Sequence, residues 1–536
     1  MSLVPPPDHL DGIANEAFTL FRAGRFAEAY ALLCRAGPLP GRPDMALLLA
    51  RTAIECGRYD SAEAALASIP AAAGAEIGIA LHMALLRQRQ GRWRESVDSF
   101  TRAAELSADH EHVLQPLLET ALHFNDTVEI ERAVARVRRN LDASPDNYLL
   151  ASTLAVALTR LGRVDDAEHY MFAVLDGRPD PVIRCINRID RLLAEERFGD
   201  AVMQLEDSAA RLALDVPPTP RAARRKIARI VMHNGHYMVH CADANDIAAA
   251  CGLPVQLLNL DSTPAAHYAA PDTLVVMPCV INAGIPRAIK QAAPACTTAA
   301  WDFDNHHSYL WSVLMLQAVD AFFPAHVTPI DYLRRWDLNS SLGPVIPLAL
   351  NQWSRGELAS LYDRYQGVTR SSALSGRFTF YPAARKRNRL LAGIAAEWPE
   401  AEVGLDDLSY AFHQRASDER FLSWRRYKTS VALPVLGDIS TRFFDALAAG
   451  QVPIVARDVL DFDRVIPPTD QATLPVVRMD EYSVAALRTA HAEAIAAFDR
   501  GGEAQAKIRH RYVLDRHMLA HRVSEIRRTL EAAAHG

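Results

Sequence analysis

The feature that most constrains this chain is a short phrase that recurs in its first half. Each copy has a glycine, an aromatic or apolar residue two positions later and a small residue five positions after the glycine. The copies start at Gly24, Gly57, Gly91 and Gly162, at intervals of 33, 34 and 71 residues. The gap of 71 leaves room for a degenerate copy near Asn125, and another follows around Phe198. Such a period is typical of stacked helical hairpins.

The phrase resembles the tetratricopeptide repeat, in which the glycine closes the first helix and the small residue allows close contact between helices. We expect five or six such repeats over residues 10–215, with these small residues buried: Ala29, Ala62, Ser96, Ala167 and Ala201. The resemblance implies a concave surface that binds a protein partner. The alternative is an array whose role is purely structural.

After residue 215 short apolar runs alternate with helical stretches, which predicts parallel sheets of the doubly wound type. One alternating block covers residues 222–350, and a second begins near the phrase FTFYP at 378–382. Two such sheets in tandem resemble the GT-B pair of Rossmann-like lobes. We therefore expect a multidomain chain, an all-α repeat array followed by an α/β pair, with an acceptor-side lobe at 222–350, a hinge at 351–376 and a donor-side lobe with closing helices at 377–536.

The most specific motif is LGDISTRFFDALAAGQVPIV at 436–455, which reads as a turn, a capped helix and a buried strand. It resembles the nucleotide-sugar signature of GT-B glycosyltransferases of the exostosin-like and spore-maturation types. Free backbone N–H groups at a helix start attract diphosphate, and an arginine can add paired hydrogen bonds. The donor-binding residues predicted here are Gly437, Asp438, Ser440, Thr441, Arg442 and Asp445, the last as an acceptor for ribose hydroxyls. The alternative is an ordinary crossover with a capped helix.

Three further cations are candidates for the donor phosphates. Arg385 and Arg387 follow the first strand of the second lobe, and Lys428 precedes a later strand. A solvated basic turn explains the arginines equally well, and a lysine at a strand edge is commonly plain surface. If the donor reading holds, these three should gather around Arg442. Retaining members usually carry two glutamates eight positions apart, and Gly437 stands where the first would be, so an inverting reaction is favoured.

Catalytic candidates lie in the first lobe, in the phrase AWDFDNHHSYLW at 300–311, directly after an apolar run. Ligands of open α/β sheets collect at the carboxyl ends of strands, and a base must deprotonate the acceptor. We predict this role for Asp302, Asp304 or His306, the last next to His307, or for His236, which with His233 flanks Gly235. Asp302-Phe303-Asp304 also spells the D-x-D of metal-dependent transferases, but the tandem sheets favour a metal-independent enzyme. The alternatives are a polar loop and a structural histidine pair.

Charge and composition narrow the class of protein. The first 215 residues hold 23 Arg, no Lys and 32 acidic residues, a net charge of −9, whereas the remainder carries +3. Neither half is basic enough for a dedicated nucleic-acid binder. The opening residues lack a secretory signal, no apolar run is long enough to span a membrane, and the seven cysteines form no CxxC pair. These features predict a cytoplasmic protein without a transmembrane segment.

A repeat array joined to a GT-B pair resembles bacterial protein O-glycosyltransferases, including those that modify flagellin. The resemblance implies that the repeats capture a protein acceptor, flagellin being one such protein, while the cleft transfers sugar from a nucleotide-sugar to Ser or Thr hydroxyls. It implies no cofactor besides that donor substrate. Two alternatives stay open, a transferase for glycans or polysaccharides that uses the repeats for docking, and a catalytically inactive interaction scaffold.

Overall fold

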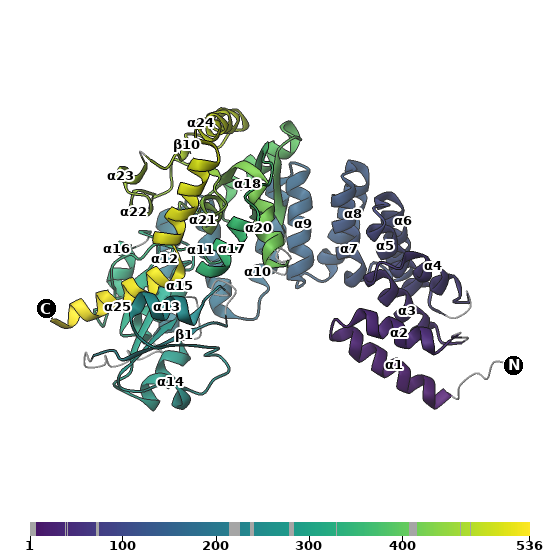
Figure 1. The fold of residues 1–536 in the computed structure, drawn as a ribbon, viewed down its shortest axis with the longest axis horizontal. Helices are drawn as coiled ribbons and strands as arrows, with labels where there is room; N and C mark the ends of the chain where they lie inside the picture. The colour runs from purple at the N-terminus through teal and green to yellow at the C-terminus, as the bar shows by residue number, and fades with distance from the viewer. Residues whose placement is uncertain are drawn as a thin grey trace. The chain divides into compact units, whose positions relative to one another are not determined.

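The computed structural model describes residues 7–37, 39, 41–70, 74–213, 226–235, 241–277, 283–328, 330–406, 415–460, 462–471 and 473–535. The chain forms two compact units, Met1–Leu161 and Gly162–Gly536 (Figure 1). This division lies within the repeats and not at the expected boundary near 215. The last three repeat helices therefore belong to the same compact unit as the sheets.

The repeats are antiparallel helix pairs, as the recurring phrase predicts. Within the described residues twelve helices follow one another, two per repeat: α1 (Pro7–Arg22), α2 (Phe26–Arg35), α3 (Pro43–Glu55), α4 (Tyr59–Ala67), α5 (Glu76–Arg89), α6 (Trp93–Leu106), α7 (Glu111–Phe124), α8 (Thr127–Ala143), α9 (Tyr148–Arg160), α10 (Val164–Asp176), α11 (Pro181–Ala194) and α12 (Phe198–Ala213). The second helix of every pair begins two residues after the repeated glycine or its substitute.

Backbone geometry explains why glycine recurs at the turn between paired helices. The four repeat glycines have φ between 69° and 76°, the left-handed region that costs other residues energy. In the two degenerate copies Asn125 and Glu196 adopt φ of 58° at the same point. The five predicted small residues are all buried, and in the Asn125 copy Ile130 takes that place. The repeat prediction is confirmed, including both degenerate copies.

The second unit contains two five-stranded parallel sheets of identical topology. The first has the order β2-β1-β3-β4-β5, with β1 (Arg229–His233), β2 (Val255–Leu258), β3 (Thr273–Met277), β4 (Thr297–Asp302) and β5 (Ala321–Pro324). The second has the order β10-β9-β8-β6-β7, with β6 (Ser371–Thr379), β7 (Glu402–Asp406), β8 (Tyr427–Ala432), β9 (Val452–Ala456) and β10 (Val477–Met479). In each sheet the first strand lies between the second and the third, so the strand order reverses there.

Helices separate the strands in both sheets. Those of the first are α13 (Ala244–Cys251), α14 (Gly284–Ala292), α15 (Tyr309–Ala318) and α16 (Ile330–Leu333), with 3₁₀ turns at Ala265–His267 and Arg334–Trp336. Those of the second are α18 (Arg385–Glu397), α20 (Ser417–Arg425), α21 (Thr441–Ala448), α22 (Phe462–Val465), α23 (Pro468–Gln471) and α24 (Val484–Arg516). The predicted fold class, an all-α array followed by paired α/β sheets, is confirmed.

The connection between the sheets differs in detail from the expected hinge at 351–376. It contains a helix, α17 (Arg355–Arg364), and strand β6 already starts at Ser371, earlier than predicted. The early part of this strand was not predicted because its sequence, SSALSGR, carries no strong strand signal. The last helix, α25 (Leu519–His535), packs on α13 of the first lobe, where the Ser524 hydroxyl donates to the Ala250 carbonyl at 2.9 Å. The closing helices therefore belong to both lobes.

The last repeat closes one face of the first sheet. Ile189 of α11 and Ala201 and Leu205 of α12 share a buried cluster with Val231 and Val275 of the sheet. Both helices pack against α15. Because burial of apolar surface is the main stabilising term of folding, this repeat is part of the core of the first lobe. None of the helices in the described ranges is both long and apolar enough to cross a bilayer.

Two glycine substitutions in the first unit should change stability in opposite directions. Gly57→Ala places a Cβ at φ +69° with no atom nearby, so only backbone strain of about 1–2 kcal/mol opposes it. Gly12→Ala, inside α1 and also free of neighbours, should stabilise by about 0.5–1 kcal/mol. Hydrogen exchange of the α1–α4 amides measures both. Shifts of the same sign would contradict the assigned turn geometry.

Candidate functional site

The candidate site lies where the strand order of the second sheet reverses, at the carboxyl ends of β6 and β8. Ligands of open α/β sheets bind at such switch points. Helix α18 starts after β6 and helix α21 starts after β8, so both helix N-termini lie at this edge. Neither helix has an acidic residue in its first turn, and α18 begins with Arg385, Lys386 and Arg387. Cations at the positive end of a helix dipole are unfavourable unless an anion compensates them.

Arg387 and Arg442 come together on the same aromatic ring. Their guanidinium carbons lie 5.7 Å and 5.5 Å from the ring centroid of Phe378, the penultimate residue of β6. Arg387 is only 3% exposed, and its Nη2 donates to the Thr379 carbonyl at 2.7 Å. Burial, and then the charge of Arg442, lower the pKa of Arg387 to about 10, while Asp438 opposes this. Two cations crowded at two helix starts are a candidate site for an anion.

The loop between β8 and α21 has the turn and cap that the motif predicts. Gly437 has φ +82°, and a Cβ there would lie 3.2 Å from the Leu460 side chain, so glycine is required. Ser440 is the N-cap of α21, its Oγ accepting from the Arg442 amide at 3.4 Å, and Thr441 is the first helical residue. Oδ1 of Asp438 accepts from the Val435 amide, which fixes the loop.

Asp445 is buried without a hydrogen bond among the described residues. It is 1% exposed, and neither of its carboxylate oxygens has a partner. Burial raises the pKa of Asp445 to about 7, although the charges of Arg442 and Arg420 and a contact with the Gln352 side chain, which does not meet hydrogen-bond geometry, lower it in part. An orphaned buried carboxylate is costly, so this position suits a ligand that donates hydrogen bonds.

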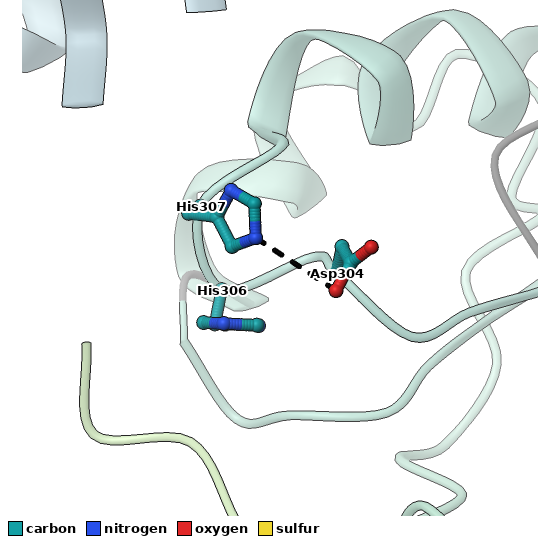
Figure 2. A group of neighbouring side chains, drawn as sticks. All are labelled: Asp304, His306 and His307. Carbon is teal, nitrogen blue, oxygen red and sulfur yellow. Dashed lines mark ion pairs between the residues drawn. The ribbon is translucent and has the colours of Figure 1, made fainter. Parts of the chain in front are cut away.

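Opposite this anion site, the loop after β4 carries a cluster of Asp304, His306 and His307 (Figure 2). His306 and His307 stand next to each other with ring centroids 4.5 Å apart, and Asp304 Oδ1 lies 3.7 Å from His307 Nε2. The other ring nitrogen of His307, Nδ1, lies 3.6 Å from Oδ2 of Asp190, a residue of the repeat helix α11. Burial lowers the pKa of His307, but Asp190 and Asp304 together raise it well above its usual value.

His306 is the neutral member of this cluster. Burial, and then the neighbouring His307 and His326, hold the pKa of His306 well below its usual value. Neither ring nitrogen has a hydrogen-bond partner among the described residues. Its Nε2 lies 4.0 Å from Oδ2 of Asp438 in the second lobe. A neutral imidazole is the form that accepts a proton.

A cavity of about 560 Å³ opens next to Arg387, and the described residues that line it do not include His306, His307 or Arg442. Its wall includes Arg387 and Gly437 of the second lobe, Tyr309 of the first lobe, and Leu193 and Phe198 of the last repeat. The Phe198 side chain is 61% exposed, and that of Leu460, after β9, is 58% exposed. The cavity therefore has the basic start of α18 on one wall, with three arginines and Lys386, and apolar and acidic side chains of the last repeat on another.

The other predicted cations take different positions. Arg385 forms an ion pair with Glu168 of α10 at 2.7 Å, so it fastens the second lobe to the repeats at the cavity rim. Lys428 stands near the start of β8, at the opposite edge of the sheet, and pairs with Asp499 of α24 at 2.8 Å. The predicted gathering of cations around Arg442 thus holds for Arg387 and not for Lys428.

Asp302 does not face the cleft. It is buried, its Oδ2 accepts from the Ser312 hydroxyl at 2.5 Å and its Oδ1 from the Asp304 amide at 3.0 Å. Burial raises the pKa of Asp302 to about 6. A base role for Asp302 does not fit this geometry, and neither does a D-x-D pair, because its carboxylate is occupied in fixing the loop and α15.

His236 lies outside the described residues. Its neighbour His233 is structural, since its Nδ1 accepts from the Leu260 amide at 3.2 Å. Gly235 leaves no room for a Cβ, which would meet the His233 ring and the Asn259 side chain at 2.7–2.8 Å. Close packing therefore explains why the first loop of this lobe has a glycine at this position.

One carboxylate and two imidazoles are also ligands that divalent cations accept. The ligand atoms of Asp304, His306 and His307 lie within 4.8 Å of one another. A cation there would compete with the proton that Asp190 and Asp304 stabilise on His307. The donor set is compatible with a metal, but its contacts favour the protonated histidine.

Sequence reasoning missed Asp190 as a site residue. It lies in the helix phrase CINRIDRLLA, where an acid reads as one more solvated charge. Tyr381, whose ring centroid is 5.9 Å from that of His307, was also missed, although it adjoins the predicted basic turn. The only signal for Tyr381 was its place at the end of a strand.

Comparisons with known proteins support the repeats. Residues 14–84 match the tetratricopeptide repeat family. No curated protein matches the chain. Among solved structures, a mutant O-GlcNAc transferase of Thermobaculum terrenum is 14% identical, covering 87% of this chain and 99% of its own, with a TM-score of 0.46. PilF of Pseudomonas aeruginosa is 15% identical, covering 38% of this chain and 91% of its own, with a TM-score of 0.28.

Arg442→Ala should weaken the binding of inorganic pyrophosphate about 10- to 100-fold, because a charge-assisted hydrogen bond contributes about 1.5–3 kcal/mol. Lys428→Ala is the matched control and should leave binding unchanged, since Lys428 pairs with Asp499. Isothermal titration calorimetry measures both. Equal losses in the two variants would place the anion elsewhere.

Asp445→Asn should stabilise the unliganded protein increasingly as pH rises. The folded pKa of about 7 exceeds the unfolded value of about 3.9, so the native state binds more protons between these pH values. Stability of the natural chain should therefore fall between about pH 4 and pH 7, on the order of a few kcal/mol, and that loss should be smaller in the variant. Thermal unfolding of both proteins at pH 4.5 and 7.5 tests this. Parallel losses in the two proteins would contradict a protonated, orphaned Asp445.

Proposed function

We propose that this chain is a glycosyltransferase that moves a sugar from a nucleotide-sugar to Ser or Thr hydroxyls of a protein. One observation carries the proposal. The arginine pair Arg387 and Arg442, built on two helix N-termini, is linked to the neutral His306 of the first lobe through Asp438, whose Oδ2 lies 4.0 Å from His306 Nε2. The resemblance of residues 436–455 to a nucleotide-sugar signature supports the same assignment.

The second lobe is the donor side in this proposal. Arg442 and Arg387 hold the diphosphate at the start of α21, where Ser440 and Thr441 begin the helix. Asp445 accepts hydrogen bonds from the ribose hydroxyls, which gives its orphaned oxygens partners. Arginines at the phosphates also stabilise the negative charge that develops on the leaving group.

The first lobe supplies the base. His306 accepts the proton of the acceptor hydroxyl while the hydroxyl oxygen attacks the anomeric carbon and the bond from that carbon to the phosphate oxygen breaks. The nucleotide leaves with both bonding electrons, next to Arg387 and Arg442. Asp304 is 42% exposed and contacts His307, the residue next to this base. The reaction inverts the anomeric configuration, and its charges are met by side chains without a metal.

The acceptor is a protein segment in this proposal. The last repeat contributes Leu193, Phe198, Glu195 and Glu196 to the cavity wall, so an acceptor segment that enters the cavity would contact both apolar and acidic side chains of that repeat. Flagellin is the proposed acceptor, and this choice rests on the resemblance to flagellin glycosyltransferases. An acceptor made of glycan is the second candidate. Asp445 stands where retaining members carry the second of their two glutamates. This shorter acid favours the third candidate, a catalytically inactive scaffold, but more weakly than the other observations favour an enzyme.

The test is transfer by the purified full chain from radiolabelled UDP-hexosamine and CMP-linked acidic sugars to flagellin and to free glycans. We expect label on the protein and no loss of rate in EDTA. His306→Gln should lower kcat about 100-fold or more with donor affinity retained, whereas His267→Gln, at an exposed 3₁₀ turn, should be unchanged. Label on glycans alone would select the second candidate. No turnover and no nucleotide-induced shift in Tm would refute both proposed activities, transfer to proteins and transfer to glycans.

A further inference from the structure

Asp190 is an acid in an unusual place for a repeat helix. It lies on α11 next to Ile189, which is buried in the core that the last repeat shares with the first sheet. Its Oδ1 is buried and has no hydrogen-bond partner within the part of the chain that the structure describes, and its Oδ2 lies 3.6 Å from Nδ1 of His307. Burying a carboxylate at a packing interface costs stability, so an arrangement that serves only packing would favour an apolar side chain.

We infer that Asp190 of the repeat array is a positioning residue of the transfer site, which holds the His307 ring next to His306. The inference rests on the proposed function for the role of His306. It makes the last repeat part of the site itself and not only a surface that captures the acceptor.

Of the groups around His307, Asp190 contributes most to holding the orientation and charge of the ring. Asp304, His306 and Ser308 belong to the same loop, Tyr381 approaches from the β6–α18 loop, and Asp190 comes from α11. Asp304 is 42% exposed and Asp190 only 16%. Because water screens the exposed carboxylate, the buried one has the stronger hold on the charge and orientation of His307.

The charge of His307 then acts on His306. His306 is faced by His307 and His326 in its own lobe and by Asp438 across the cleft. A cation at His307 disfavours a second proton on His306, so His306 stays a free base at lower pH. Loss of the Asp190 carboxylate should let His307 lose its proton and allow His306 to hold one.

Asp190→Asn tests this through the pH dependence of kcat. A base must be deprotonated, so the rate rises through the pKa of His306. In the variant this rise should move to higher pH by about one unit, so kcat should fall by up to about tenfold at pH values below the pKa of His306 and stay unchanged at pH 8, with donor KM unchanged. Asp190→Glu keeps the charge and should restore the position of the rise. Asp176→Asn is the control, because the Asp176 carboxylate at the end of α10 pairs with Arg191 of α11 and not with a histidine of the cluster.

A second measurement does not need turnover. Histidine labelled with ¹³C at Cε1 in the full chain reports the protonation of His306 and His307 by NMR, with assignments from His306→Gln and His307→Gln. We expect His307 to titrate at lower pH in Asp190→Asn and His306 at higher pH. Unchanged titrations, or a kcat loss equal at every pH and matched by Asp176→Asn, would overturn the inference. Shifted titrations in a protein without transferase activity would instead refute only the proposed function.

Discussion

The packing of α11 and α12 on the first sheet is the interaction on which the rest of the second unit depends. Ala201 and Leu205 bury apolar surface with Val231 and Val275, so the last repeat closes a core that the sheet cannot close alone. This packing places Asp190 beside His307 and puts Leu193 and Phe198 on the wall of the cavity. It also explains why the compact units divide at Leu161 and not where the sheets begin.

The basic turn at the start of α18 shows how one short segment serves two tasks. Arg387 points inward to Phe378 and the anion site. Its neighbours face the repeats, where the partners are acids of α10 and of the turn before α12: Arg385 with Glu168, Lys386 with Glu196 and Arg389 with Asp165. Most of these pairs are exposed and contribute little stability each. Together they connect the end of the repeats to the donor-side lobe at the rim of the cavity.

Most of the fold could be predicted from the sequence because its signals are local. A glycine at φ near 70° must recur wherever a helix pair turns, so the repeats are visible as a period, and even Asn125 fits it. The motif around Arg442 is likewise a contiguous turn and helix cap. By contrast, the hold of Asp190 on His307 joins residues 117 positions apart through tertiary packing, and no local pattern marks it. Lys428 was expected before a strand and lies at the start of β8, but the start of a parallel strand is at the opposite edge of the sheet from Arg442, so it was wrongly grouped with the donor cations.

The central claim is that a nucleotide diphosphate binds at the carboxyl ends of β6 and β8, opposite His306. Hydrogen exchange of the full chain with and without nucleoside diphosphate measures this most directly, because a bound ligand protects the amides it contacts. We expect protection confined to the segments that begin α18 and α21, about residues 383–389 and 435–445. Protection only in the repeat groove around Gly24 and Arg58, or at neither helix start, would contradict it.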